Sequence, residues 1–284
     1  DMKVVFDKKR TDVRKKGNTQ MNDFIEKTEF VENTNLEYCK KVAIAFLHEP
    51  ILQTDLFGII THPVFESNFT IEINEDGTQG SGLVDLLKDK KMLSRYIRCY
   101  ENRINEQKDL YGILKFIRKQ YLLQYLNITK EHLSCRDFSE SLIEGWVLDE
   151  YANQNTAVSK EELLNMFLMA DAEYMIDDED KKTYQTIKNS KKVTIYRGVT
   201  EYNEKDVDKS LSWTLDVDTA LYFATRYNQH GNVYKATISP DDVLAYTNIR
   251  NEHEVIVNPI GLNNIRKDNE LSISKDNIEP SIDM

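Results

Sequence analysis

Glycine and proline, the residues that most strongly interrupt regular secondary structure, are scarce in this sequence. The chain has 10 glycines and 5 prolines among 284 residues. That is about 5% of the chain, whereas average usage is about 12%. Tight turns depend on these two residues, so their scarcity excludes collagen-like and linker-dominated chains and most turn-rich all-β architectures. It favours long helical stretches, in a chain with room for two domains or one large one and a core that needs no disulfides.

Charge and cysteine content limit the class of partner and the compartment. Lys and Arg total 37 and Asp and Glu total 48, which gives a net charge of −11. An acidic chain repels phosphate groups, so we expect neither nucleic acid nor a membrane surface as a partner. The three cysteines form no CxxC pair and the five histidines show no ligand spacing, so we expect no disulfide framework and no metal. The sequence has no apolar run long enough to span a bilayer, and we expect no signal peptide and a cytoplasmic location.

The first part of the chain predicts a helical region with a small β element. Residues 56–73 are rich in β-branched and aromatic types, which predicts one or two short strands. The stretch 74–82, NEDGTQGSG, is the strongest break in the sequence, and its glycines fit no phosphate-binding motif. We therefore interpret it as a loop or domain junction. This interpretation gives an N-terminal region over residues 1–82 whose role the sequence does not indicate.

The rest of the chain predicts a second domain over residues 83–284, so that the protein as a whole is α+β. Helical periodicity over 83–189 predicts a helical layer. Ser159 and Glu162 have the spacing of a capping box at the start of one of its helices. Short apolar strands and one amphipathic helix then predict a mixed α/β core over 190–275.

Two polar features of this core are candidates for ligand binding. Arg197 and Gly198 end an apolar strand, where an arginine can hold a diphosphate and a glycine lets a ligand approach the backbone. An ordinary surface ion pair is the alternative for Arg197. Ser212 and Thr214 lie two residues apart in a strand and so share one face. The alternative is that Thr214 or Asp216 caps the helix that follows.

A third feature is a pair of carboxylates, Glu252 and Glu254, at the start of an apolar strand. Alternate residues of a strand lie on one face, about 6.5–7 Å apart. Two carboxylates that face a cleft can divide the roles of electrostatic stabiliser and base. The alternative is the solvent-exposed face of an edge strand.

Taken in order, the segments TIYRGV, SLSWTLDVDTALYFATR and VLAYTNIRNEHEVIVNP resemble the R-S-E class of mono-ADP-ribosyltransferases, most closely the compact type found in phage and bacterial genomes. The resemblance covers about residues 190–260. It implies an ADP-ribosyltransferase fold with two short packed β-sheets that form an NAD cleft. It also implies an effector that acts in the cytoplasm of its producer or of an infected or intoxicated host.

The resemblance also implies a role for each matching residue. Arg197 would grip the NAD phosphates, and the Gly198 backbone would contact the nicotinamide. Ser212 would position both NAD and Glu254, the catalytic glutamate, while Glu252 would serve transfer to the acceptor. The remaining NAD-binding positions would be Trp213, which replaces the usual Thr or Ser, Thr214 and Phe223. Only 15 residues separate Arg197 from Ser212, which predicts a more open NAD cleft than in large toxins.

The chemistry of ADP-ribosyl transfer suits these residue types. Cleavage of the bond to nicotinamide develops positive charge on the ribose, which a carboxylate such as Glu254 stabilises. Because an acceptor guanidinium is always protonated, a second carboxylate, Glu252, is needed to take its proton. We expect a target protein with an acceptor arginine, NAD as the second substrate and no metal. The alternatives are an NAD glycohydrolase with the same site and a catalytically silent partner-binding protein. The sequence does not indicate the oligomeric state.

Overall fold

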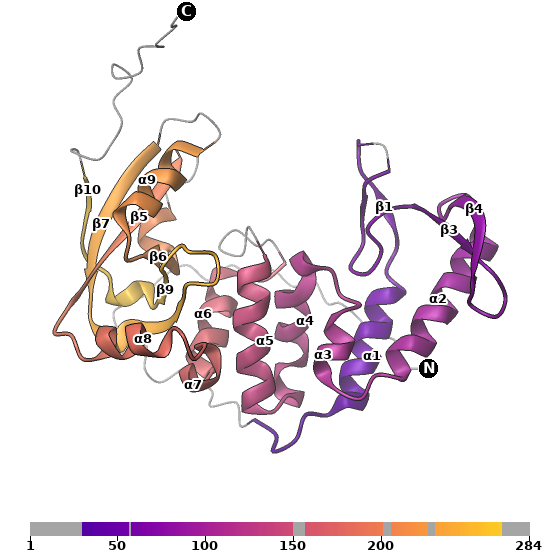
Figure 1. Ribbon diagram of the computed structural model, residues 1–284, viewed down its shortest axis with the longest axis horizontal. Coiled ribbons are helices and arrows are strands. Elements are labelled where there is room, and N and C mark those ends of the chain that lie inside the picture. The colour runs from indigo at the N-terminus through magenta and orange to yellow at the C-terminus, as the bar shows by residue number, and fades with distance from the viewer. Residues whose placement is uncertain (1–29, 57, 150–156, 201–205, 227–230, 269–284) are drawn as a thin grey trace, which may run out of the picture.

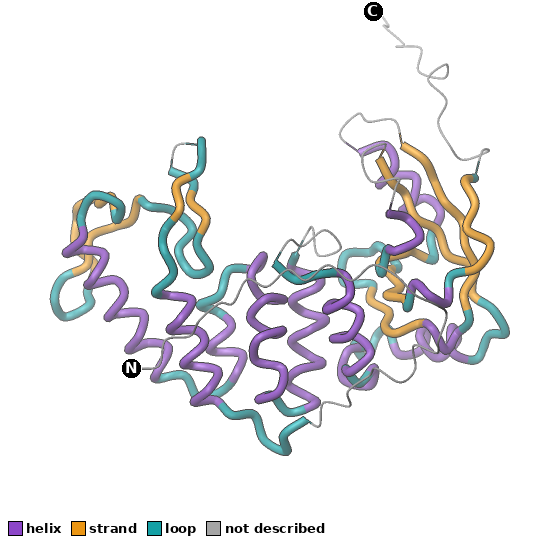
Figure 2. The backbone as a smooth tube through the Cα atoms, turned by 180° about the vertical axis from the view of Figure 1, so that it is seen from behind, coloured by secondary structure: helices purple, strands orange, loops and turns teal. Residues whose placement is uncertain are grey.

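The computed structural model describes residues 30–56, 58–149, 157–200, 206–226 and 231–268. Within these ranges the protein is α+β, as the sequence predicts. A row of helices connects two projecting β-structures, a pair of small hairpins at one end and a six-stranded sheet at the other, and both project from the same side of the row (Figures 1 and 2). The basic first 20 residues and the tail after residue 268 lie outside the described residues.

Nine helices lie in the described part of the chain, and most of them begin at a side-chain cap. Ser134 accepts a hydrogen bond from the Asp137 amide, 3.1 Å away. Ser159 and Glu162 form the predicted capping box, which is thereby confirmed. The helices are α1 (Leu36–Leu47), α2 (Lys90–Asn105), α3 (Leu110–Leu114), α4 (Leu122–Thr129), α5 (Cys135–Leu148), α6 (Lys160–Met169), α7 (Ala172–Met175), α8 (Lys181–Lys188) and α9 (Val217–Thr225).

The N-terminal hairpins confirm the predicted strands and correct the predicted loop. Strands β1 (Leu52–Gln53) and β2 (Ile60–Thr61) pair, as do β3 (Phe69–Ile73) and β4 (Gln79–Asp85). The prediction of a loop over 74–82 followed directly by helix was wrong, because β4 includes position 82 and the next helix begins at Lys90.

Glycines that suggested a loop have a packing role in β4. A Cβ atom on Gly80 would lie 3.1 Å from the Glu72 Cβ atom, and one on Gly82 would lie 3.3 Å from a Glu72 carboxylate oxygen. The missing side chains therefore leave room for Glu72 on the neighbouring strand β3. Glycine is depleted in strands, which is why the sequence pattern indicated a loop here.

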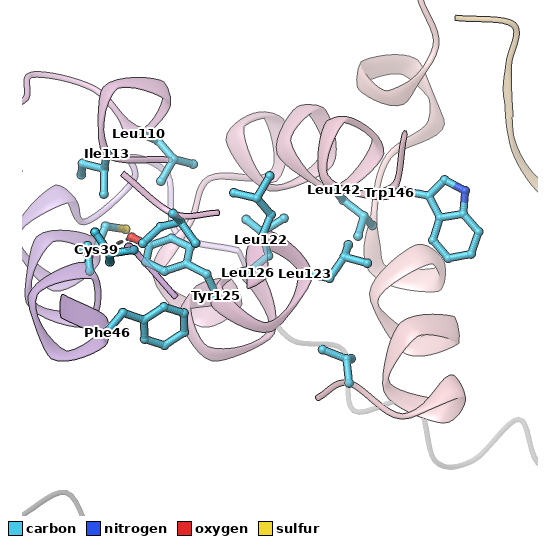
Figure 3. Close-up of a cluster of buried hydrophobic side chains, with 14 of the residues drawn as sticks. Cys39, Phe46, Leu110, Ile113, Leu122, Leu123, Tyr125, Leu126, Leu142 and Trp146 are labelled. Atoms are coloured by element: carbon cyan, nitrogen blue, oxygen red, sulfur yellow. Dashed lines mark hydrogen bonds between the residues drawn. The ribbon is translucent and has the colours of Figure 1, made fainter. Parts of the chain in front are cut away.

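One continuous hydrophobic core extends from the helices to the sheet. Tyr125 is fully buried in this core, and its hydroxyl donates to the Cys39 carbonyl at 2.8 Å (Figure 3). The same cluster includes Leu211 and Ile256 from the sheet end of the molecule. The helical layer and the β core are thus packed against each other. The side chains labelled in Figure 3 are Cys39, Phe46, Leu110, Ile113, Leu122, Leu123, Tyr125, Leu126, Leu142 and Trp146.

The six-stranded sheet has the order β10-β7-β5-β6-β9-β8, with antiparallel pairing throughout. Its halves, β10-β7-β5 and β6-β9-β8, are joined by one residue pair, Tyr196 with Thr214. The expectation of two separate sheets is corrected to two three-stranded halves with this single connection. The strands are β5 (Val193–Thr200), β6 (Ser212–Thr214), β7 (Gly231–Ile238), β8 (Val243–Thr247), β9 (Glu254–Val257) and β10 (Asn263–Lys267).

A buried histidine fixes the connection between the hairpins and the helices. His62 Nδ1 accepts from the amides of Val64 and Phe65, at 3.0 and 2.9 Å, and Nε2 donates to the Glu49 carbonyl at 3.1 Å. Every ring nitrogen is therefore satisfied only in the neutral form. Burial lowers the pKa of His62 to about 4, and the nearby Arg118 acts in the same direction.

We predict that the protein loses stability as the pH falls from 7 to 5. The unfolded chain protonates His62 near pH 6.5, whereas the folded protein does so only near pH 4. Protons therefore favour the unfolded state in this window, and the loss is about 2 kcal/mol at pH 5. Urea unfolding of the wild type and His62→Asn at pH 7 and pH 5 measures it. An equal loss in both proteins would show that His62 is not the responsible group.

Candidate active site

Three adjacent strands bring Arg197, Ser212 and Glu254 together. Arg197 is on β5, Ser212 opens β6 and Glu254 opens β9, and these strands are neighbours in the sheet. The Arg197 Nη1 atom donates to the Ser212 carbonyl. The Ser212 hydroxyl donates to Glu254 Oε1 at 2.6 Å. The three residues therefore form one connected hydrogen-bonded group, with Arg197 joined to the Ser212 backbone and Glu254 to the Ser212 side chain.

Glu254 has a further partner that sequence reasoning missed. Trp146 on α5 donates its indole N–H to the same Glu254 oxygen, Oε1, at 3.1 Å. Trp146 lies at the end of the helical core, and its indole nitrogen points away from the other labelled side chains (Figure 3). Both residues are almost fully buried, with 2% of Trp146 and 5% of Glu254 exposed. A buried carboxylate needs such donors, because burial without them is costly.

Two buried polar atoms of this group have no hydrogen-bond partner. They are Arg197 Nε and Glu254 Oε2, and among the described residues only Asn68 Oδ1 shares this property. Buried polar groups are satisfied in the great majority of cases. Two such atoms in one hydrogen-bonded group therefore point to a polar ligand that satisfies them.

Glu252 lies in the loop before β9 and not in the strand itself. Asn251 and His253, on either side of it, have positive φ angles of 55° and 46°, and the Thr214 hydroxyl donates to the Glu252 carbonyl at 2.6 Å. The predicted strand alternation was therefore wrong for this pair. The left-handed conformation of His253 changes the direction of the chain between the two carboxylates.

The two carboxylates nevertheless meet at one guanidinium group, that of Arg250. Its Nη2 atom lies 3.0 Å from Glu252 Oε2 and 3.6 Å from Glu254 Oε2. Its Nη1 atom donates to the Val147 carbonyl at the end of α5, at 3.3 Å. Arg250 was not singled out by the sequence. The spacing of an arginine four residues before a glutamate carries no specific signal. The turn between Arg250 and Glu254 is what brings this guanidinium to the two carboxylates.

Burial sets the charge states of the site. Desolvation lowers the pKa of Arg197 to about 10, and Glu254 opposes this shift, so the guanidinium stays charged at neutral pH. Burial raises the pKa of Glu252, and the neighbouring Glu254 adds to this effect, whereas Arg250 and Arg226 lower it. A carboxylate with a raised pKa accepts a proton more readily near neutral pH.

Gly198 is required by helix packing. A Cβ atom at this position would lie 1.8 Å from the Ala220 carbonyl oxygen of α9. On the next strand, a Cβ atom on Gly231 would lie 2.2 Å from the Ala224 carbonyl oxygen. Two glycines thus let the backbone of α9 rest on β5 and β7. The sequence argument explained Gly198 by ligand approach, and helix packing is a second reason for a glycine here that the sequence did not indicate.

The structure gives different surroundings to the other expected NAD-binding residues. Trp213 is 2% exposed and donates to the Ser210 carbonyl at 3.0 Å. It therefore lies in the core, and we withdraw it as a ligand contact. Thr214 is buried and holds the Glu252 carbonyl, while Asp216 caps α9, as one alternative proposed. Phe223 is partly exposed on α9, with the Arg226 guanidinium 5.1 Å from its ring centre.

Comparisons with known proteins give no family for this chain. No protein-family model matches it, and neither a search of curated proteins nor a search of solved structures finds a match. The described residues contain no group of three or more His, Cys, Asp or Glu side chains that could hold a metal ion. In the same part of the chain, every helix is too short or too polar to cross a membrane.

We predict that Gly198→Ala separates α9 from the sheet. The new methyl group would collide with backbone atoms, which cannot rotate away, so the free energy of unfolding should fall by about 3 kcal/mol or more. Gly145→Ala, within α5, is the matched control. Its new Cβ atom would be at least 3.4 Å from its neighbours, so stability should change by less than about 1 kcal/mol. Equal stability of the two variants in urea unfolding would contradict this packing argument.

Proposed function

We propose that this protein is a mono-ADP-ribosyltransferase that transfers ADP-ribose from NAD to an arginine side chain and releases nicotinamide. The observation that carries the proposal is the hydrogen-bonded group of Arg197, Ser212 and Glu254. Glu252 lies beside this group, because Glu252 and Glu254 both contact the Arg250 guanidinium. The chemistry of the group fits NAD. A guanidinium that is charged at neutral pH and whose Nε has no hydrogen bond suits the diphosphate, and a carboxylate oxygen without a hydrogen bond suits a ribose hydroxyl.

Of the two carboxylate oxygens of Glu254, Oε1 accepts two hydrogen bonds and Oε2 accepts none. Ser212 and Trp146 both donate to Oε1, which fixes the orientation of the carboxylate. This leaves Oε2 to accept from the ribose 2′-hydroxyl and to stabilise the positive charge that develops on the ribose. Such preorganisation is effective because the carboxylate does not have to reorient as the charge forms.

Glu252 has the properties of the base that transfer to arginine requires. Its carboxylate already contacts a guanidinium at 3.0 Å, which is the group that an acceptor arginine would present. Its raised pKa favours acceptance of the proton that the guanidinium must lose. Water as the acceptor makes no such demand, so Glu252 separates transfer from hydrolysis.

We predict that Glu254→Gln and Glu252→Gln fail in different ways. With NAD and the guanidine acceptor agmatine, Glu254→Gln should lose nicotinamide release by at least about 100-fold, since it removes the charge that stabilises the transition state. Glu252→Gln should still release nicotinamide but should lose agmatine modification to a similar extent. Nicotinamide and modified agmatine are both quantified by mass spectrometry.

Glu106→Gln, at an exposed position after α2, is the matched control and should behave as the wild type. Agmatine modification by Glu252→Gln at the wild-type rate would refute arginine-directed transfer. Release of nicotinamide by the wild type without any modified acceptor would favour the glycohydrolase alternative. If the wild type neither releases nicotinamide nor binds NAD, the protein is not an enzyme of this class.

We predict that Trp146→Phe lowers kcat for nicotinamide release by about 10-fold or more and leaves KM for NAD nearly unchanged. The variant keeps an aromatic ring but loses the hydrogen bond to Glu254, and hydrogen bonds to charged groups contribute about 1.5–3 kcal/mol. Phe167→Leu is the control, because Phe167 packs edge-on against Trp146, with ring centroids 5.2 Å apart, without reaching the carboxylate. An equal loss of kcat in both variants would assign Trp146 a packing role only.

A further inference from the structure

Arg250 lies where the proposed reaction would require the guanidinium of its acceptor arginine. Among the described residues, its guanidinium is the one in contact with both carboxylates, at 3.0 Å from Glu252 and 3.6 Å from Glu254. The side chain is 34% exposed, so it lies at the surface of the site rather than in the core. The hydrogen bond to the Val147 carbonyl holds it there.

The loop that carries Arg250 is built to keep this geometry. The Asn251 amide donates to the Asn248 carbonyl at 2.9 Å, and the Asn248 side chain accepts from the His253 amide at 3.0 Å. Asn251 itself adopts the left-handed conformation that asparagine tolerates well. The loop therefore closes on itself and places the guanidinium back over the two glutamates that follow it.

The nitrogen nearest to the carboxylates is also the one best placed to react. Arg250 Nη2 and the ribose 2′-hydroxyl would share one neighbour, Glu254 Oε2, which has no hydrogen bond of its own. The anomeric carbon is bonded to the carbon that bears this hydroxyl. Two groups that contact the same carboxylate oxygen lie near each other, and the positioning of reacting groups next to each other is what bond formation requires.

We propose that Arg250 is an internal acceptor, so that the protein modifies its own Arg250 with ADP-ribose when no other acceptor is bound. This inference rests on the proposed function. The bond between the anomeric carbon and nicotinamide breaks, and its electron pair leaves with neutral nicotinamide. A new bond forms from that carbon to Arg250 Nη2, and the proton released by Nη2 passes to Glu252. Atoms and charges balance with NAD as the only co-substrate.

The test is incubation of the full-length chain with NAD alone, followed by peptide mapping with a fragmentation method that preserves the modification. The expected result is one ADP-ribose per chain, on Arg250. Agmatine modification is measured beside it, so that the two claims are separated. Modified agmatine with an unmodified Arg250 would overturn the internal acceptor and leave the transferase intact. The absence of both products would overturn the transferase and this inference with it.

Three variants test the assignment further. Arg250→Lys keeps the positive charge but offers an amine in place of a guanidinium, and self-modification should fall at least tenfold. Arg136→Lys, at an exposed arginine of α5 that pairs with Glu140, should be modified as the wild type is. In a mixture with wild-type protein, an affinity-tagged Glu254→Gln chain should stay unmodified, because the reaction is internal. Modification of the tagged chain at the wild-type rate would contradict the internal route.

Discussion

The buried carboxylate of Glu254 is the group on which the rest of the site depends. A charge at this depth is tolerated only where donors reach it, and the donors come from two parts of the molecule. Ser212 supplies one from the neighbouring strand, and Trp146 supplies the other from the helical layer. The shared hydrophobic core holds these two parts in register. Helix α5 is therefore as much a part of the site as the strands that carry the polar residues.

Local chemistry made part of this structure predictable. The capping box at Ser159 and the strands within 56–73 follow from residue types at short spacing. The grouping of Arg197, Ser212 and Glu254 is what the resemblance to ADP-ribosyltransferases implies. Trp146 and Arg250 were not predicted, because their roles depend on contacts that spacing does not encode. Trp146 is 108 residues from Glu254 in sequence, and Arg250 reaches both carboxylates only through a turn with two left-handed residues.

Several glycines have packing roles that the sequence analysis did not identify. Gly80 and Gly82 suggested a loop, but they lie in a strand where they make room for Glu72. Gly198 suggested ligand approach, and it is also the point at which α9 touches the sheet. In each case the absence of a side chain leaves room for a neighbour from elsewhere in the chain. The sequence does not show that a glycine is required at such a position, because the requirement depends on which segments lie side by side in the folded protein.

The two arginines of the site make different contacts, and the proposed function gives each of them a different role. The Arg197 guanidinium donates to the Ser212 carbonyl, whereas the Arg250 guanidinium contacts both glutamates. In the proposed function, the Arg197 guanidinium would bind the diphosphate and the Arg250 guanidinium would take the position of an acceptor. Under this proposal, an external acceptor arginine would have to displace Arg250 from Glu252 before it reacts, which would link acceptor binding to the conformation of the loop over 248–253.

The most direct test of this account is a crystal structure of the protein with a non-hydrolysable NAD analogue. The account predicts the diphosphate within hydrogen-bond distance of Arg197 Nε and the ribose 2′-hydroxyl on Glu254 Oε2, so that both unpartnered atoms gain a partner. An analogue bound elsewhere, or one that does not bind at concentrations that saturate NAD-dependent transferases, would contradict it.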